Sequence, residues 1–152
     1  RFTLFFMLVP TSRDYYEYLK DYAKNKKNVI FRDPCAMQDI SRNLNDFDIG
    51  VYMLTPNSFN KLNALPNKFF DFIQARLMVA IGPSPEMAKI VKKYNLDIVS
   101  DDFEPKTLAN KLNRLKKEDT ICYKNNSHIA AKELGAENNK EILISLVERL
   151  LT

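Results

Sequence analysis

Short runs of apolar residues alternate along the chain with segments in which apolar residues recur every three or four positions. The runs predict strands that are covered on both faces, and the periodic segments predict amphipathic helices. The predicted strands cover residues 2–9, 29–31, 49–54, 78–81 and 98–99. Strands of this kind separated by helices indicate an α/β fold with a doubly wound parallel sheet and extra helices at the C-terminal end.

Capping residues mark the starts of several predicted helices. Thr11 or Ser12 caps the first, Ser84 precedes Pro85 at the start of another, and Glu104 precedes Pro105 at a third. The first helix is expected to carry its apolar residues on one face, at Tyr15, Tyr16, Leu19, Tyr22 and Ala23. The last helix is expected to bury Ile142, Leu143, Leu146, Val147 and Leu150.

The composition is that of an ordinary globular protein, with 45% hydrophobic and 28% charged residues among 152. No apolar run reaches the roughly 18 residues that a membrane-spanning helix needs. Cys35 and Cys122 stand alone and His128 is the one histidine, so neither a zinc site nor a disulfide framework is predicted. A cytoplasmic location is expected, and the amphipathic last helix leaves peripheral association with a membrane open.

The net charge of +4 comes from 23 basic and 19 acidic residues. The lysines are scattered along the predicted helices and do not alternate with aromatic residues. A nucleic-acid-binding surface normally has a denser basic patch, so no nucleic-acid partner is expected. A mild positive excess favours small anionic ligands.

Familiar phosphate-binding and metal-binding motifs give no site. The chain has three glycines and contains neither GxGxxG nor GxxxxGK[ST]. Asp46-Phe47-Asp48 has the DxD form of metal-dependent sugar transferases but precedes a strand, whereas ligands of such sheets bind at the carboxyl ends. Asp101-Asp102 lies at the correct end, and we interpret it as a cap of the next helix. No metal is expected, and His128 is predicted to be a surface residue.

A long polar connection that starts at Thr55 leads into ALPNKFFDFIQA, residues 64–75. Pro66 favours a helix start, which leaves the first backbone amides able to bind a phosphate oxygen. Lys68 is unfavourable at the positive end of a helix dipole unless an anion binds there. Asp71 lies on the same face. The residues alone leave two alternatives open, a Lys68–Asp71 surface ion pair or a binding site.

The longer segment ALPNKFFDFIQARLMVAIGPSPEMAKIV resembles the signature of GT-B-type glycosyltransferases, in the family that includes bacterial capsule and polysaccharide enzymes. That signature is a Pro-x-Lys-x-x-Glu helix followed by a strand, a glycine and a helix. The resemblance extends from the first strand to about Leu115 and includes NVIF at residues 28–31 and DIGV at residues 48–51. It implies a Rossmann-like domain that binds a nucleotide-diphosphate sugar, the donor half of an enzyme that transfers a sugar to a glycan or lipid-linked acceptor.

The resemblance also implies roles for individual residues. Asp71 would bind the donor ribose, while Lys68 and the amides of residues 67–69 would bind the diphosphate without a metal or cofactor. Asn63 stands at the position of the family's first acidic residue, which leaves the catalytic group open, and Arg76-Leu77-Met78 replaces the family's Gly-x-Pro. The base is expected at residues 34–37. The expected substrate-binding residues are Pro34, Met37, Thr55, Leu65, Pro66, Asn67, Lys68, Phe69 and Asp71.

The family's donor half normally begins with one further strand–helix unit and follows an acceptor-binding domain. Residues 1–152 are therefore expected to be a single nucleotide-sugar-binding domain from a longer protein and to be inactive alone. The base, the sugar, the acceptor, the stereochemical outcome and the oligomeric state are left open.

Two other functions stay open from the sequence. Half of a nucleotide-sugar epimerase or a phosphorylase would share the fold, but an epimerase would need acidic and histidine residues, and His128 alone is present. A non-catalytic α/β interaction or receiver-type module would need acidic residues after the first strand, where the chain has Val9-Pro10-Thr11. Such a module would bind no nucleotide.

Overall fold

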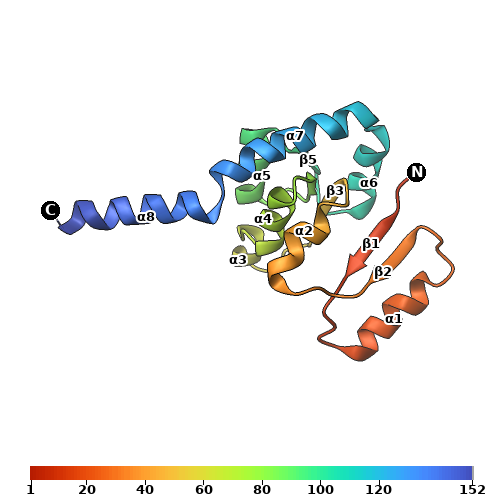
Figure 1. The fold of residues 1–152 in the computed structure, drawn as a ribbon. Coiled ribbons are helices and arrows are strands. Elements are labelled where there is room, and N and C mark those ends of the chain that lie inside the picture. Colours follow the sequence, from red (N-terminus) through yellow and green to blue (C-terminus); the bar gives the residue numbers. More distant parts are fainter. Residues whose placement is uncertain (152) are drawn as a thin grey trace. The chain divides into compact units, whose positions relative to one another are not determined.

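A computed structural model describes residues 1–151, which fall into two compact units divided after Asp39 (Figure 1). Each unit combines parallel strands with helices, which confirms the mixed α/β prediction. The strands occur where the sequence predicts them but pair as a two-stranded and a three-stranded sheet. Their union in one doubly wound sheet, and the single domain that it implies, stay predictions.

The first unit is a parallel strand–helix–strand motif. Its elements are β1 (Leu4–Met7), α1 (Arg13–Ala23), β2 (Val29–Arg32) and the 3-10 helix η1 (Met37–Asp39). β1 pairs with β2 over four residues, from Leu4 opposite Val29, so β1 is shorter than the predicted strand. Ser12 is the N-cap of α1, and its Oγ accepts a hydrogen bond from the Tyr15 amide at 3.4 Å.

The buried face of α1 is narrower than its apolar pattern predicts. Tyr15 and Tyr22, both expected on that face, are 61% and 65% exposed. They stack instead along the helix with the exposed Tyr18, at ring-centroid distances of 6.1 and 6.3 Å. Tyr16 packs edge-on against Phe31 of β2. A two-stranded sheet covers only a narrow stripe of a helix, and a tyrosine tolerates exposure because of its hydroxyl group.

The second unit contains the three-stranded sheet. Its elements are α2 (Ile40–Leu44), β3 (Ile49–Tyr52), α3 (Phe59–Leu62), α4 (Asn67–Gln74), β4 (Met78–Ile81), α5 (Pro85–Tyr94), β5 (Asp97–Val99), α6 (Pro105–Arg114), α7 (Lys117–Glu133) and α8 (Ala136–Leu151). β4 lies between β3 and β5, and all three strands are parallel. Ile49 pairs with Met78, and Val79 pairs with Asp97.

The core of the second unit is built on both faces of β4, all four residues of which are buried. Val79 and Ile81 pack with buried residues of α4, α5 and α7, whereas Met78 and Ala80 pack with Ile98 of β5 and Leu108 of α6. Helices therefore cover both faces of this sheet, as the continuous apolar run at residues 78–81 predicts.

The prediction that the last helix buries its apolar face is wrong. All five of its apolar residues are exposed, from 46% at Val147 to 86% at Leu150. α8 extends beyond the end of α7 (Figure 1). Helical periodicity shows that a helix has a face suited to burial, but a covering surface must come from elsewhere in the protein or from a partner.

A tyrosine–carboxylate pair joins α7 to the start of β5. The carboxylate of Asp97 accepts a hydrogen bond from the Tyr123 hydroxyl. Burial raises the pKa of Asp97, and this hydrogen bond opposes the increase. Burial, together with the negative charge of Asp97, raises the pKa of Tyr123 to about 12.

We expect Tyr123→Phe to remove part of the loss of stability at alkaline pH. Because the pKa of Tyr123 is above its ordinary value of 10.0 in the folded protein, the neutral phenol contributes stability that is complete below pH 10 and is lost as the pH rises through about 12. Urea denaturation across this range should show a shallower decline for Tyr123→Phe than for the wild type. The exposed Tyr22→Phe is the control, and equal slopes in all three proteins would contradict the prediction.

Candidate functional site

The polar connection after β3 contains a short helix that the sequence analysis did not predict. The Ser58 Oγ caps α3 by accepting a hydrogen bond from the Lys61 amide at 3.2 Å. Asn63 ends the helix, and its Nδ2 donates to the Phe59 carbonyl at 3.0 Å. Ser58, directly before Phe59-Asn60-Lys61-Leu62, was the capping signal that could have predicted this helix. Asn63, which the resemblance aligns with an acidic residue, therefore has a local structural role.

The start of α4 presents two backbone donors without acceptors. Pro66 is the cap residue, in an extended conformation with φ −73° and ψ 148°. The Phe69 amide donates to the Pro66 carbonyl at 3.0 Å, so the expectation that this amide is available to a ligand is wrong. Within residues 1–151, the amides of Asn67 and Lys68 have no hydrogen-bond acceptor. Two of the three predicted donors are thus available.

Lys68 and Asp71 have no charged partner in the described part of the chain. None of the ion pairs of residues 1–151 includes either residue, so the alternative of a Lys68–Asp71 surface pair is wrong. Lys68 is exposed, whereas Asp71 is partly buried, and this burial raises the pKa of Asp71. A partly desolvated carboxylate without a hydrogen-bond donor costs free energy, which a ligand hydroxyl could offset.

The opposite face of α4 holds the helix against the sheet, as predicted. Phe69 and Ile73 are fully buried in the core. Phe72 lies directly over Gly50 of β3, where an added Cβ would be 2.3 Å from the Phe72 Cγ. The glycine thus permits a close approach between α4 and β3, and this contact positions the helix that carries Lys68 and Asp71.

The other predicted binding residues are divided between the two units. Thr55 follows β3 and Leu65 precedes α4, so both are in the unit that contains Lys68 and Asp71. Thr55 is exposed, and Leu65 is 43% exposed. Pro34 and Met37 are exposed residues of the first unit, on each side of the entry to η1. Their contribution to a base-binding site stays a prediction.

Arg76, which the resemblance aligns with a glycine, adopts a backbone conformation that glycine favours, with φ 63°. Its guanidinium donates to the Gln74 carbonyl at 2.6 Å and to the Nδ1 of His128 at 3.0 Å. These hydrogen bonds help to hold an arginine in this conformation. His128 is exposed, as predicted, and serves here as a hydrogen-bond acceptor.

Asp102 has the capping role that the sequence analysis favoured, whereas Asp48 and Asp101 form ion pairs that it did not predict. Asp48 of the DxD sequence pairs with Lys124 at 3.1 Å. Asp102 caps the start of α6 by accepting from the Glu104 amide at 3.0 Å and from the Thr107 hydroxyl at 3.1 Å. Asp101 pairs with Lys111 at 2.6 Å. No group of three or more His, Cys, Asp and Glu residues within positions 1–151 is arranged to hold a metal ion.

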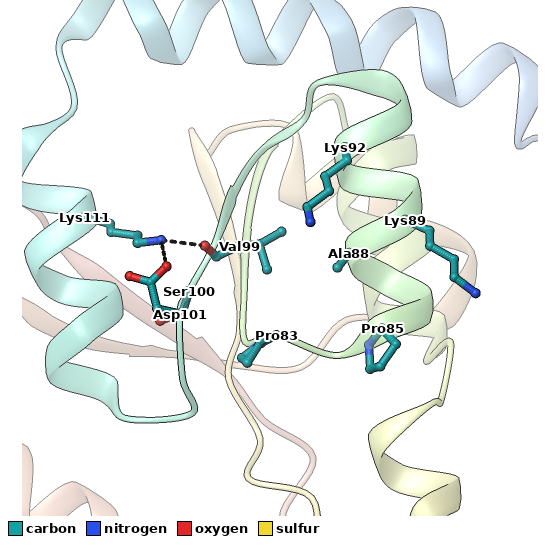
Figure 2. A pocket seen from close by; sticks show the side chains of 9 residues that line it. All are labelled: Pro83, Pro85, Ala88, Lys89, Lys92, Val99, Ser100, Asp101 and Lys111. Carbon is teal, nitrogen blue, oxygen red and sulfur yellow. Dashed lines mark hydrogen bonds and ion pairs between the residues drawn. The ribbon is translucent and has the colours of Figure 1, made fainter.

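A hollow that the sequence analysis did not anticipate lies at the carboxyl ends of β4 and β5 (Figure 2). It has a volume of about 550 Å³, and its walls come from α5, α6 and the segments after these strands. Its lysines belong to no motif, and its serine follows a strand without any flanking signal. Only the tertiary structure brings these residues together.

No protein-family model, curated protein or solved structure matches the chain. In the described part of the chain, no helix has both the length and the hydropathy needed to cross a membrane. The resemblance to glycosyltransferases therefore stays a prediction.

Proposed function

We propose that residues 1–152 form the donor-binding domain of a GT-B-type glycosyltransferase, which binds a nucleotide-diphosphate sugar. The proposal rests on one observation: the start of α4 combines backbone hydrogen-bond donors and a carboxylate acceptor that have no partner in the described residues. The Asn67 and Lys68 amides lack acceptors, and the partly buried Asp71 carboxylate lacks a donor, within the chain described. In a ligand with an anionic group beside a diol, the anionic group would accept hydrogen bonds from the amides and the diol would donate to the carboxylate.

The proposed chemistry assigns these groups to different parts of the donor. The two amides, the helix dipole and the Lys68 ammonium would bind the diphosphate, and Asp71 would accept hydrogen bonds from the ribose hydroxyls. Neutralising a departing nucleoside diphosphate is electrostatic catalysis, which in this proposal needs no metal. Transfer to a glycan or lipid-linked acceptor would require a further acceptor-binding domain.

Strand pairing supports the doubly wound part of the proposal. In a sheet of order 3-2-1-4-5-6, strands 2 and 3 pair with each other, strands 4, 5 and 6 form a row, and strand 1 alone joins the two sets. β1 with β2, and β3 with β4 and β5, reproduce these two sets in chain order. The two observed pairings are therefore compatible with the doubly wound sheet of the proposal.

Substitution of the two charged residues of α4 tests the proposal. Asp71→Ala and Lys68→Ala should each weaken nucleoside diphosphate binding at least about tenfold, as expected for a hydrogen bond to a charged group. Stability should change little, because neither side chain has a partner in the described residues. Titration calorimetry with UDP, GDP, ADP and TDP would measure the affinities and identify the preferred base.

Asp46→Ala and Lys140→Ala are matched charge controls. Asp46 precedes the amino end of β3, and Lys140 is an exposed residue of α8, so both variants should bind like the wild type. Wild-type affinity in both α4 variants would overturn the proposed site. If none of the four diphosphates binds, the result would favour the interaction-module alternative.

A further inference from the structure

The hollow at the ends of β4 and β5 combines an apolar wall with basic side chains. Its volume of about 550 Å³ is in the range of small-molecule sites. Pro83, Pro85, Ala88 and Val99 form the apolar part of the wall. The remaining lining residues are Lys89, Lys92, Ser100, Asp101 and Lys111 (Figure 2).

Ser100 contributes a buried hydroxyl that has no partner. The residue is 2% exposed, and its Oγ is the one buried side-chain polar atom in residues 1–151 without a hydrogen bond. Buried polar groups are nearly always paired, because an unpaired one carries a desolvation cost. A serine hydroxyl can turn by rotation about one bond, so a ligand oxygen in the adjoining hollow could satisfy it.

The three lysines of the hollow differ in their partners. Lys111 donates to the Val99 carbonyl at 3.0 Å and pairs with Asp101, while Lys89 pairs with Glu86 at 2.6 Å. Lys92 has no ion pair or side-chain hydrogen bond in the described residues. Figure 2 shows its side chain extending from α5 toward β5, while Lys89 points away from that strand. The charge available to a ligand is therefore that of Lys92.

We propose that this hollow binds a small metabolite with a phosphate or carboxylate group, held by the Lys92 ammonium and the Ser100 hydroxyl. The carbon skeleton of the metabolite packs against Pro83, Ala88 and Val99. The Asp101 carboxylate is already paired with Lys111, so its repulsion of an anion is reduced. The site goes beyond the proposed nucleotide function, since it uses residues of α5, β5 and α6 and neither Lys68 nor Asp71.

Binding of defined anions tests the site. Inorganic phosphate, ribose 5-phosphate and citrate are titrated separately, with the midpoint of thermal unfolding and calorimetric affinity as readouts. The wild type should show saturable stabilisation by at least one of them. Lys92→Met and Ser100→Ala should each weaken that binding about tenfold. Without ligand, Ser100→Ala should melt at the same temperature or higher, because it removes an unpaired buried hydroxyl.

Lys132→Met is the matched control, since Lys92 and Lys132 are exposed lysines in the last turns of α5 and α7. It should bind like the wild type, as should Asp71→Ala, which separates this site from the nucleotide site. A response to the two phosphates alone assigns a phosphate ligand, and a response to citrate alone assigns a carboxylate. No saturable binding of any probe, or wild-type affinity in Lys92→Met, would overturn the proposal.

Discussion

Gly50→Ala is expected to lower the free energy of unfolding by about 3 kcal/mol, at the upper end of the usual cost of overpacking. The added Cβ would lie 2.3, 2.5 and 2.7 Å from the Cγ, Cδ2 and Cβ of Phe72, all far inside van der Waals contact. The contact includes the root of the Phe72 side chain, so rotation of the ring cannot relieve it. α4 would have to move away from β3. Urea denaturation of the two proteins measures the loss.

Gly135→Ala provides the matched control for this substitution. There the added Cβ would lie 3.3 Å from its nearest neighbours, the Ala131 carbonyl oxygen and the Glu137 Oε2, which small shifts can accommodate. Its expected change is within about 1 kcal/mol, because a lower entropy of the unfolded chain offsets mild crowding. A Gly50→Ala protein as stable as Gly135→Ala would show that α4 does not depend on close contact with β3.

Phe69→Ala is expected to destabilise the protein by about 3–5 kcal/mol, the usual cost of removing a buried aromatic ring. Phe69 has no exposed surface and belongs to the larger hydrophobic cluster of the second unit, which joins α4 to β4, α5 and α7. Truncation therefore removes the transfer free energy of the ring and leaves a cavity between α4 and the sheet. The midpoint and slope of urea unfolding would measure this loss.

Phe59→Ala removes the same group from a different environment. Phe59 is the first residue of α3 and is 79% exposed, so its loss should change the free energy of unfolding by no more than about 0.5 kcal/mol. Similar losses in both variants would contradict the description of α4 as a core helix. Because Lys68 precedes Phe69 directly, Phe69→Ala should also weaken ligand binding at α4, even where the protein stays folded.

Some elements could be predicted closely because local and tertiary preferences agree. β4 has the predicted bounds, since its four apolar residues are buried on both faces and Arg76 and Pro83 lie outside its ends. α5 and α6 begin at Pro85 and Pro105, where a residue without an amide hydrogen suits the first turn. The short α3 was missed because four residues show no helical period, although Ser58 was a capping signal.

The candidate site was predictable only in part, because a local pattern does not show which side chains and amides contact each other. The proline and the charges of ALPNKFFDF indicate a helix start with a possible ligand, but they do not show whether Lys68 and Asp71 satisfy each other. Their side chains are separate in the folded chain, and the amide of Phe69 is used within the first turn. The hollow at Lys92 and Ser100 could not be predicted from the sequence, because its residues come from different elements.

By itself, the sequence determined where most strands and helices lie and which face of α4 is buried, because both depend on periodicity and capping within a few neighbouring residues. Only the tertiary structure decided that the last helix exposes its apolar face, that Gly50 receives Phe72, and that the Ser100 hydroxyl is buried without a partner. Each of these properties depends on which distant segment covers a residue. Coverage is set by packing across the whole fold, which no local pattern encodes.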